Sequence, residues 1–275
     1  MADRPDPGRG APLTAPVGFD VADDGAVVVR AAARERLDAL GLTTVDGAFA
    51  LPAAPRAQAG GRYKALAQVD DAHGRLFVKR WDFDRLEVWL RGALKWNFPV
   101  FSGRRELDNL LALAAAGLRV PVPLAAGERT RGRRRQAFLV TCALEGEPLD
   151  RAPAPATARE RFALVRDVAA LAARLHGAGC WHKDLYLGNV MRGPDGRLGL
   201  LDCERVERRA GGPPLRWRVK DLAALDLSAT WATRADRARF LRAYLGRPRL
   251  DVDARRLAAA VRRKSARMRR RGAKW

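Results

Sequence analysis

One short segment restricts this chain more than any other, and it is His182-Lys183-Asp184-Leu185-Tyr186-Leu187-Gly188-Asn189. A long amphipathic pattern, Ala158 to His176, precedes it and ends at Gly177, as helices commonly do at glycine. An apolar stretch, Leu198 to Leu201, follows and leads directly into Asp202. A histidine, a carboxylate and an asparagine after a helix, followed by a second carboxylate directly after a strand, are compatible with few folds.

The spacing of these polar residues matches a known need of phosphoryl transfer. A carboxylate must orient the attacking hydroxyl and accept its proton, and an amide oxygen nearby must hold Mg²⁺. Asp184 is the candidate base and Asn189 the candidate metal ligand, while His182 braces the loop and Asp202 supplies a second carboxylate. A single Asp or Asn in a loop is usually only a turn residue, but that reading does not explain four such residues in register.

Two further residues are expected upstream if the chain transfers phosphate. One is a lysine on a strand, which holds the α- and β-phosphates of ATP, and the other is a glutamate on the next helix, which holds that lysine. Lys79 ends the predicted strand from Leu76, within a hairpin spanning 62–80. Glu106 lies in the first turns of a helix for which Ser102 is the predicted N-cap. Asp108 competes with Glu106 for this role.

The loop that would cover the phosphates is poorly marked. No Gly-x-Gly-x-x-Gly precedes Lys79, and Gly60-Gly61 is the candidate because it lies just ahead of the first hairpin strand. Further along, Asp221 opens a predicted helix. It either hydrogen-bonds the backbone of the 182–189 loop or is an ordinary acidic residue of a first helical turn.

The order of predicted elements indicates an α+β, protein-kinase-like bilobal fold, with a small β-rich N-lobe and a larger helical C-lobe. Strands cluster in the first half of the chain and helices dominate the second, with a basic loop expected at 128–135 and a hinge at 145–148. The expected divisions are a flexible N-terminal arm (1–16), the N-lobe (17–144), the C-lobe (145–260) and a basic C-terminal tail (261–275).

Composition limits the classes of partner. The formal net charge is +21, and only seven of the 52 basic residues are lysine. A strongly basic surface attracts anions and anionic membranes, and nucleic acid is a less favoured alternative. The three cysteines show no metal or redox spacing, and we expect them to be free thiols. The N-terminus lacks a secretory pattern and no run approaches the ~20 apolar residues of a membrane span, so a cytoplasmic location is expected.

An aromatic and basic segment, Trp81 to Phe101, allows two interpretations. Leu86, Trp89 and Leu90 fall at helical spacing and form an apolar stripe. Such a stripe usually faces a protein core, here that of the N-lobe. Alternatively, the segment contacts lipid, because tryptophan and basic residues favour the membrane interface.

With these residues in place, the chain resembles the lipopolysaccharide kinase family, the Kdo/heptose (WaaP-like) kinases of Gram-negative envelopes. The resemblance covers about 64–228. Its marks besides the 182–189 loop are Phe77-Val78-Lys79-Arg80, Gly103-Arg104-Arg105-Glu106-Leu107, Ala116-Gly117-Leu118-Arg119-Val120-Pro121-Val122-Pro123, Leu200-Leu201-Asp202 and Lys220-Asp221-Leu222.

The resemblance implies ATP and Mg²⁺ as cofactors, transfer of the γ-phosphate to a sugar hydroxyl of the lipopolysaccharide inner core, and work at the inner face of the inner membrane. The catalytic loop alone also fits a protein kinase or an aminoglycoside-type phosphotransferase. Asp202 is followed by Cys203-Glu204 instead of Phe-Gly, which argues against a typical regulated protein kinase. A non-catalytic scaffold that binds membrane or nucleic acid is the alternative outside enzymes.

Overall fold

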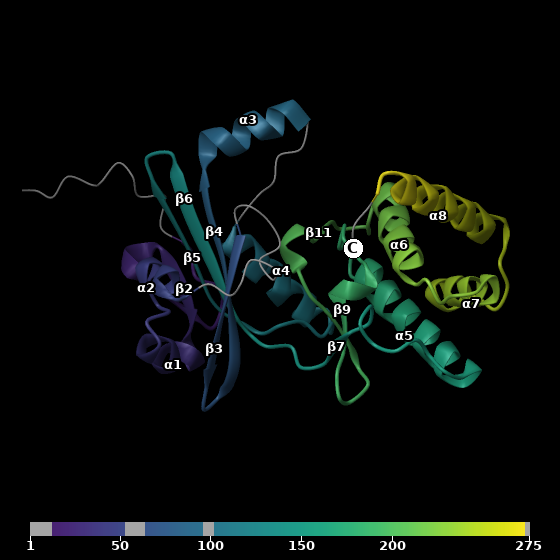
Figure 1. The fold of residues 1–275 in the computed structure, drawn as a ribbon, viewed down its shortest axis with the longest axis horizontal. Coiled ribbons are helices and arrows are strands. Elements are labelled where there is room, and N and C mark those ends of the chain that lie inside the picture. The colour runs from purple at the N-terminus through teal and green to yellow at the C-terminus, as the bar shows by residue number, and fades with distance from the viewer. Residues whose placement is uncertain (1–12, 53–63, 96–101, 273–275) are drawn as a thin grey trace, which may run out of the picture. The chain divides into compact units, whose positions relative to one another are not determined.

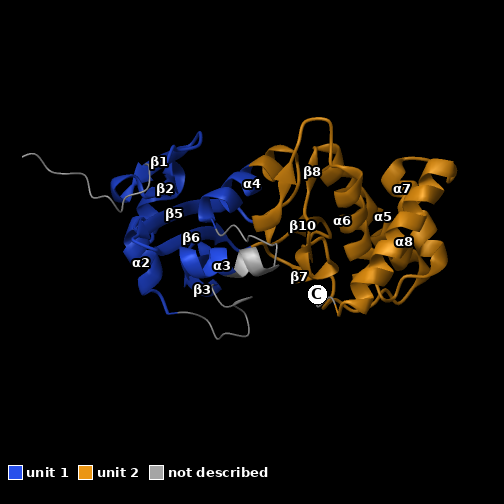
Figure 2. Cartoon of the chain, turned by 90° about the horizontal axis from the view of Figure 1, so that it is seen from above, with its two compact units in different colours: residues 1–111, 121–143 blue, residues 112–120, 144–275 orange. Residues whose placement is uncertain are grey.

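The computed structural model describes residues 13–52, 64–95 and 102–272. The chain divides into two compact units, shown in different colours in Figure 2. The first unit comprises residues 1–111 and 121–143, and the second comprises residues 112–120 and 144–275. A functional division into an ATP-holding lobe and a catalytic lobe stays a prediction.

The first unit is built on a six-stranded antiparallel sheet, most of whose strands are labelled in Figure 1; their order is β1-β2-β5-β6-β4-β3. The predicted hairpin is β3 and β4, in which Leu66 is paired with Lys79. The strand continues beyond Lys79, because Trp81 and Phe83 alternate with polar residues and are buried. The bounds are β1 Phe19–Ala22, β2 Val27–Arg30, β3 Lys64–Asp71, β4 Gly74–Asp84, β5 Pro123–Arg131 and β6 Arg134–Cys142.

Strand β4 serves both faces of the sheet because successive side chains point to opposite sides. On one face, Val78 packs in a cluster with helices α1 (Arg34–Ala39) and α2 (Val45–Ala50). The buried Arg80 guanidinium shares this face and donates to the carbonyls of Ala48, Phe49 and Leu51, at the C-terminal end of α2. Lys79 is therefore left on the opposite face.

The basic loop predicted at 128–135 is wrong. Strands β5 and β6 run through it and are paired as far as Arg131 and Arg134, so that only a tight turn at Gly132 remains. Carboxylates accommodate the charge: Arg134 pairs with Asp82 at 2.6 Å. A run of arginines looks like a loop in sequence, but its neutralising partners come from strands far away in the chain.

The second unit is mainly helical. Its helices are α5 Ala158–Gly177, α6 Leu215–Ser228, α7 Arg234–Leu245 and α8 Val252–Arg270, with a three-stranded sheet β10-β9-β7 and a two-stranded sheet β11-β8. The short strands are β7 Glu147–Pro148, β8 Cys180–Trp181, β9 Val190–Arg192, β10 Leu198–Leu200 and β11 Glu207–Arg208. Thr157 begins α5 with a complete capping box. The α+β class, with a β-rich first part and a helical second part, is confirmed.

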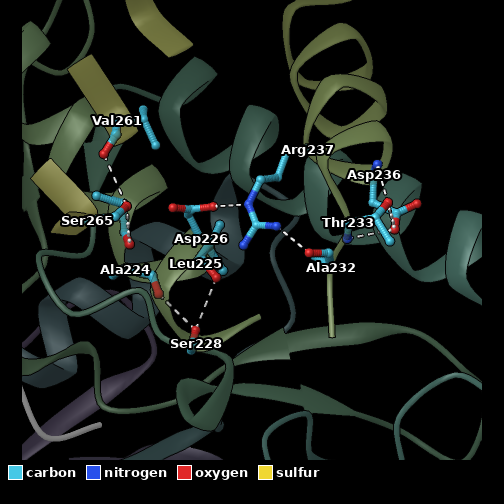
Figure 3. A network of polar contacts seen from close by, with 11 residues as sticks. Ala224, Leu225, Asp226, Ser228, Ala232, Thr233, Asp236, Arg237, Val261 and Ser265 are labelled. Carbon is cyan, nitrogen blue, oxygen red and sulfur yellow. Dashed lines mark hydrogen bonds and ion pairs between the residues drawn. The ribbon is translucent and has the colours of Figure 1, made fainter. Parts of the chain in front are cut away.

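Helix α6 is fastened to its neighbours by the polar contacts in Figure 3. The Arg237 side chain of α7 donates to Asp226 of α6 at 2.5 Å, and Ser265 of α8 donates to the carbonyl of Ala223 at 3.3 Å. Ser265 and Met268 are buried. Residues 261–270 of the predicted basic tail are thus the last turns of α8, and most of their exposed side chains are arginine.

Helix α3 (Arg85–Lys95) leaves its apolar stripe exposed in the first unit. Leu86, Trp89 and Leu90 are 43%, 57% and 53% exposed, while Val88 is buried. The interpretation of a helix docked by this stripe on the core is wrong for these three side chains. The rest of the predicted segment, from residue 96 to 101, lies outside the described residues, as do 1–12 of the predicted arm.

Helix α4 (Gly103–Ala115) begins against strand β6. A β-carbon placed at Gly103 would lie 1.9 Å from the carbonyl oxygen of Phe138, so only glycine allows this approach. Ser102 caps the helix by accepting a hydrogen bond from the Arg105 N–H at 3.1 Å. Its hydroxyl also donates to Glu128 of β5. The start of α4 is therefore fixed to the sheet.

We expect Gly103→Ala to destabilise the protein by about 1–3 kcal/mol, because the start of α4 must move away from the sheet. Urea unfolding monitored by circular dichroism measures the change. Gly177→Ala is the matched control: a β-carbon there meets nothing within 4 Å, and alanine is favoured over glycine in helices. Equal stability of the two variants would contradict the close approach.

Candidate active site

The first unit brings together two of the predicted residues. The Lys79 ammonium donates to both carboxylate oxygens of Glu106, at 2.7 and 2.9 Å. The Glu106 side chain is 4% exposed and that of Lys79 is 23% exposed. Asp108, the competing acid, pairs instead with Arg104 one turn earlier at 2.9 Å. The structure thus pairs the strand lysine with Glu106 and not with Asp108.

The second unit holds the 182–189 loop by one carboxylate. Asp221, fully buried on α6, accepts hydrogen bonds from the backbone N–H groups of His182 and Lys183, each at 2.7 Å. Lys183 adopts a left-handed conformation with φ of 70°, which costs an L-residue about 1–2 kcal/mol. Asp221 compensates for this strain, and of its two interpretations the structure bears out the contact with the loop backbone.

A chain of side chains orients Asp221 in turn. His176, the last buried residue of α5, approaches Asp221 through Nε2 at 3.3 Å and Tyr244 of α7 through Nδ1 at 2.8 Å. Arg218 donates to the Tyr244 hydroxyl at 3.1 Å. Burial raises the pKa of Tyr244, so its hydroxyl stays protonated and can hydrogen-bond His176 Nδ1. Because a carboxylate only accepts, the contact with Asp221 requires a proton on His176 Nε2.

The His182 ring braces the loop against the strand that carries Asp202. Its Nε2 lies 2.8 Å from the carbonyl oxygen of Leu201, which can only accept, so Nε2 carries the proton. The residue is fully buried, and Nδ1 finds no partner among the described residues. This contact ties His182 to the chain one residue before Asp202.

Asn189 and Asp202 are brought to the same end of a hairpin. Strands β9 and β10 pair Val190 with Leu200, and the Leu201 N–H donates to the Asn189 carbonyl at 2.9 Å. The Asn189 amide nitrogen donates to the carbonyl of Asp184 at 2.8 Å. This leaves the Asn189 side-chain oxygen available to a cation.

This donor set fits Mg²⁺. The ion prefers oxygen ligands and is commonly held by one or two carboxylates, with water and phosphate completing its octahedron. Asn189 and Asp202 supply one amide oxygen and one carboxylate. In the described parts of the chain, no cluster of three or more His, Cys, Asp or Glu forms a metal cage.

Asp184 lies between two cations that sequence reasoning did not connect with it. Arg205, on the turn after Asp202, contacts one carboxylate oxygen at 2.7 Å. Lys220 of α6 lies 3.5 Å from the other. The only sequence signal for Lys220 is its place directly before Asp221, and Arg205 gave none.

The predicted site residues thus form two groups. The second unit gathers His182, Asp184, Asn189 and Asp202 on one loop and the adjoining strand, and the first unit pairs Lys79 with Glu106. The predicted phosphate-loop residues Gly60 and Gly61 lie outside the described residues. All three cysteines are free thiols; Cys180 and Cys203 are buried, as is usual for free cysteine, whereas Cys142 is half-buried.

Removal of the Asp221 carboxylate should destabilise the second unit. We expect Asp221→Ala to cost about 2–6 kcal/mol, since each of two buried N–H groups left without an acceptor costs about 1–3 kcal/mol. Asp221→Asn keeps one acceptor oxygen and should cost about half as much. Denaturant unfolding measures both.

Asp253→Asn serves as the control for this series. Asp253 forms an exposed pair with Arg256 at 3.5 Å, and exposed pairs contribute about 0–1 kcal/mol. If Asp221→Ala destabilised the protein no more than Asp253→Asn, Asp221 would not be the anchor of the loop.

Comparison with known proteins shows which enzymes this chain is similar to. The chain is 34% identical over 178 residues to lipopolysaccharide core heptose(I) kinase WaaP of Pseudomonas aeruginosa, a match covering 59% of this chain and 66% of that protein, just under two thirds. It is 26% identical over 196 residues to WaaP of Escherichia coli, covering 65% of this chain and 74% of that protein.

Among solved structures, the bifunctional kinase-methyltransferase WbdD is similar with a TM-score of 0.46 and 16% identity, over 78% of this chain and 50% of that chain. A second WbdD structure gives a TM-score of 0.44 and 17% identity, over 74% of this chain and 44% of that chain.

A family profile matches most of the chain. The profile describes the lipopolysaccharide kinase (Kdo/WaaP) family and matches residues 50–244. This range includes every predicted site residue in both units. The chain belongs to the lipopolysaccharide kinase (Kdo/WaaP) family.

Proposed function

We propose that this protein is an ATP- and Mg²⁺-dependent kinase that transfers the γ-phosphate to a sugar hydroxyl, of Kdo or heptose, in the lipopolysaccharide inner core. The observation that carries the proposal is the loop fixed by Asp221, which presents Asp184 beside Asn189 and Asp202. Membership of the lipopolysaccharide kinase family supports the acceptor class, and the names of the WaaP relatives support a core heptose.

The residues divide the work by their chemistry. Lys79, held by Glu106, binds the α- and β-phosphates of ATP, as the strand lysine does in protein kinases. Asn189 and Asp202 hold Mg²⁺. The bound ion neutralises charge on the phosphates and orients them. The backbone N–H groups that cover the phosphates are proposed to come from Gly60 and Gly61.

Asp184 is the proposed general base. Its carboxylate orients the acceptor hydroxyl and takes its proton as the oxygen forms a bond to the γ-phosphorus and the bond to ADP breaks. Its side chain is 25% exposed, so an acceptor can reach it. His182 does not touch the reactants and acts through the position of the loop.

The surface suits an anionic glycolipid at a membrane. Helix α8 exposes a basic side whose members are Arg255, Arg256, Arg262, Arg263, Arg267, Arg269 and Arg270. Each basic residue near an anionic leaflet contributes about 1 kcal/mol. In the described part of the chain, no helix is long and apolar enough to cross a membrane. We propose peripheral binding at the inner face of the inner membrane.

Transfer of radiolabelled phosphate from ATP to purified inner-core glycolipid tests this function. We expect Asp184→Asn to lower kcat about 10²–10⁴-fold, because a positioned base contributes that much. Asp202→Asn should abolish transfer or shift its Mg²⁺ dependence to higher concentration, and EDTA should stop the wild-type reaction.

Asp195→Asn is the control for these variants, since Asp195 lies in the exposed turn between β9 and β10. Parallel reactions contain a generic protein, an aminoglycoside and lipid A precursors. Label in one of these and none in the inner core would contradict the acceptor class. Full activity of the Asp184 and Asp202 variants would contradict the assigned roles.

The exposed stripe of α3 should add to membrane binding. We expect Trp89→Ala with Leu90→Ala to weaken sedimentation with phosphatidylglycerol vesicles about tenfold or more, because each buried apolar side chain contributes about 1.5–3 kcal/mol. Val122→Ala removes another exposed apolar side chain of the first unit and should have no effect. Wild-type binding by the double variant would exclude the stripe from the interface.

A further inference from the structure

Lys220 lies beside Asp184, the proposed base, and has no part in the function proposed above. Its ammonium lies 3.5 Å from Asp184 Oδ1, longer than the 2.7–2.9 Å typical of a charge-assisted hydrogen bond. The side chain is 19% exposed, and burial lowers its pKa. A largely buried lysine with only a loose carboxylate partner is typical of a functional site.

The position of Lys220 is fixed by its neighbours on α6. It directly precedes Asp221, which binds the backbone of the 182–189 loop. Trp217 lies one turn earlier, with its ring 5.7 Å from the Lys220 ammonium. Asp221 therefore links the loop that carries Asp184 to the turn of α6 that carries Lys220, and this link sets the distance between the two side chains.

Phosphoryl transfer requires positive charge near the phosphoryl group that is transferred. The transferred group spreads negative charge over three oxygens, and kinases stabilise it with Lys, Arg or metal. The loop between Asp184 and Asn189 reads Leu-Tyr-Leu-Gly and contains no cation. A protein cation that assists the metal ion at the transferred group must therefore come from another element.

Two other cations near the loop are less suitable. Lys183 is paired with Glu207 at 2.5 Å and its side chain faces Trp217. Arg205 already bonds Asp184 Oδ2 at 2.7 Å, and its side chain is 53% exposed, so water screens its charge. Lys183 is as deeply buried as Lys220 but is committed to its close pair with Glu207, whereas Lys220 is less tightly paired than either cation and more deeply buried than Arg205.

We propose that Lys220 is a catalytic residue whose ammonium contacts a non-bridging oxygen of the phosphoryl group during transfer. The inference rests on the proposed kinase function. The acceptor proton passes to Asp184, the acceptor oxygen bonds to the γ-phosphorus, and ADP leaves with the electron pair of the broken bond. Lys220 keeps its proton throughout and supplies charge only.

The test begins with Lys220→Met, which keeps the length of the side chain and removes the charge. We expect kcat to fall about 10²–10³-fold, as for loss of one preorganised donor to the transition state, while the KM for ATP changes little. The matched control is Arg216→Met on the same helix: Arg216 is exposed and lies over the Trp217 ring, and its loss should leave kcat unchanged.

The pH profile separates catalysis from structure. Because burial lowers the pKa of Lys220, wild-type kcat should fall as alkaline pH removes its proton. Lys220→Arg, whose charge persists to higher pH, should restore part of the activity and move this fall to higher pH. An unchanged alkaline limb in the Arg variant would overturn the proposal even if the Met variant does not fold.

Binding provides a readout that needs no acceptor. Calorimetry with Mg²⁺-ADP, and with Mg²⁺-ADP plus fluoroaluminate as a mimic of the transferred phosphoryl group, should show Lys220→Met losing affinity only for the second. Equal losses for both, or none, would overturn the role of Lys220. Wild-type protein that binds the mimic but phosphorylates no glycolipid would instead contradict the proposed acceptor, so the two failures are distinguishable.

Discussion

The contact on which the active loop depends is the buried Asp221 carboxylate. A buried carboxylate is expensive unless every acceptor position finds a donor, and here two backbone N–H groups and a histidine supply them. The arrangement fixes the backbone at Lys183, where a left-handed conformation would otherwise relax. Asp184 follows Lys183 directly, so its position is set by Asp221, a residue of helix α6 that is distant in the sequence.

This dependence explains why α6 is so firmly fastened. Contacts from α7 and α8 hold it at Asp226 and Ala223, and Ser228 at its end accepts the Leu187 N–H at 3.0 Å. The loop is thereby tied to α6 at both of its ends. In the first unit, the packed start of α4 does the same for Glu106. In each unit, the anchoring of a helix thus fixes the position of predicted site residues.

Much of the second unit's site could be predicted because its residues lie on one continuous segment. The order of His182, Asp184, Asn189 and Asp202 reflects a loop and a short hairpin, which local sequence determines. The pairing of Lys79 with Glu106 also followed, since strand and helix are neighbours in the chain. Arg205 and Lys220 beside Asp184 could not be predicted, because three separate elements meet there. The prediction of a basic loop at 128–135 was wrong for the same reason, because carboxylate partners of its arginines lie on other strands.

Because most basic residues of the chain are arginine, the few positions that carry lysine are informative. Of 52 basic residues seven are lysine, so 52 − 7 = 45 are arginine, yet the cations at positions 79, 183 and 220 are all lysine. Arginine presents a wide planar fork, whereas lysine presents a compact charge on a slender stem. At position 79, the single ammonium nitrogen donates to both Glu106 oxygens, at 2.7 and 2.9 Å. At position 220, the ammonium lies 3.5 Å from Asp184 Oδ1 and 5.7 Å from the centre of the Trp217 ring. Arginine predominates on the exposed side of α8, whereas the lysines at positions 79, 183 and 220 each contact a carboxylate in the predicted site region through one compact charge.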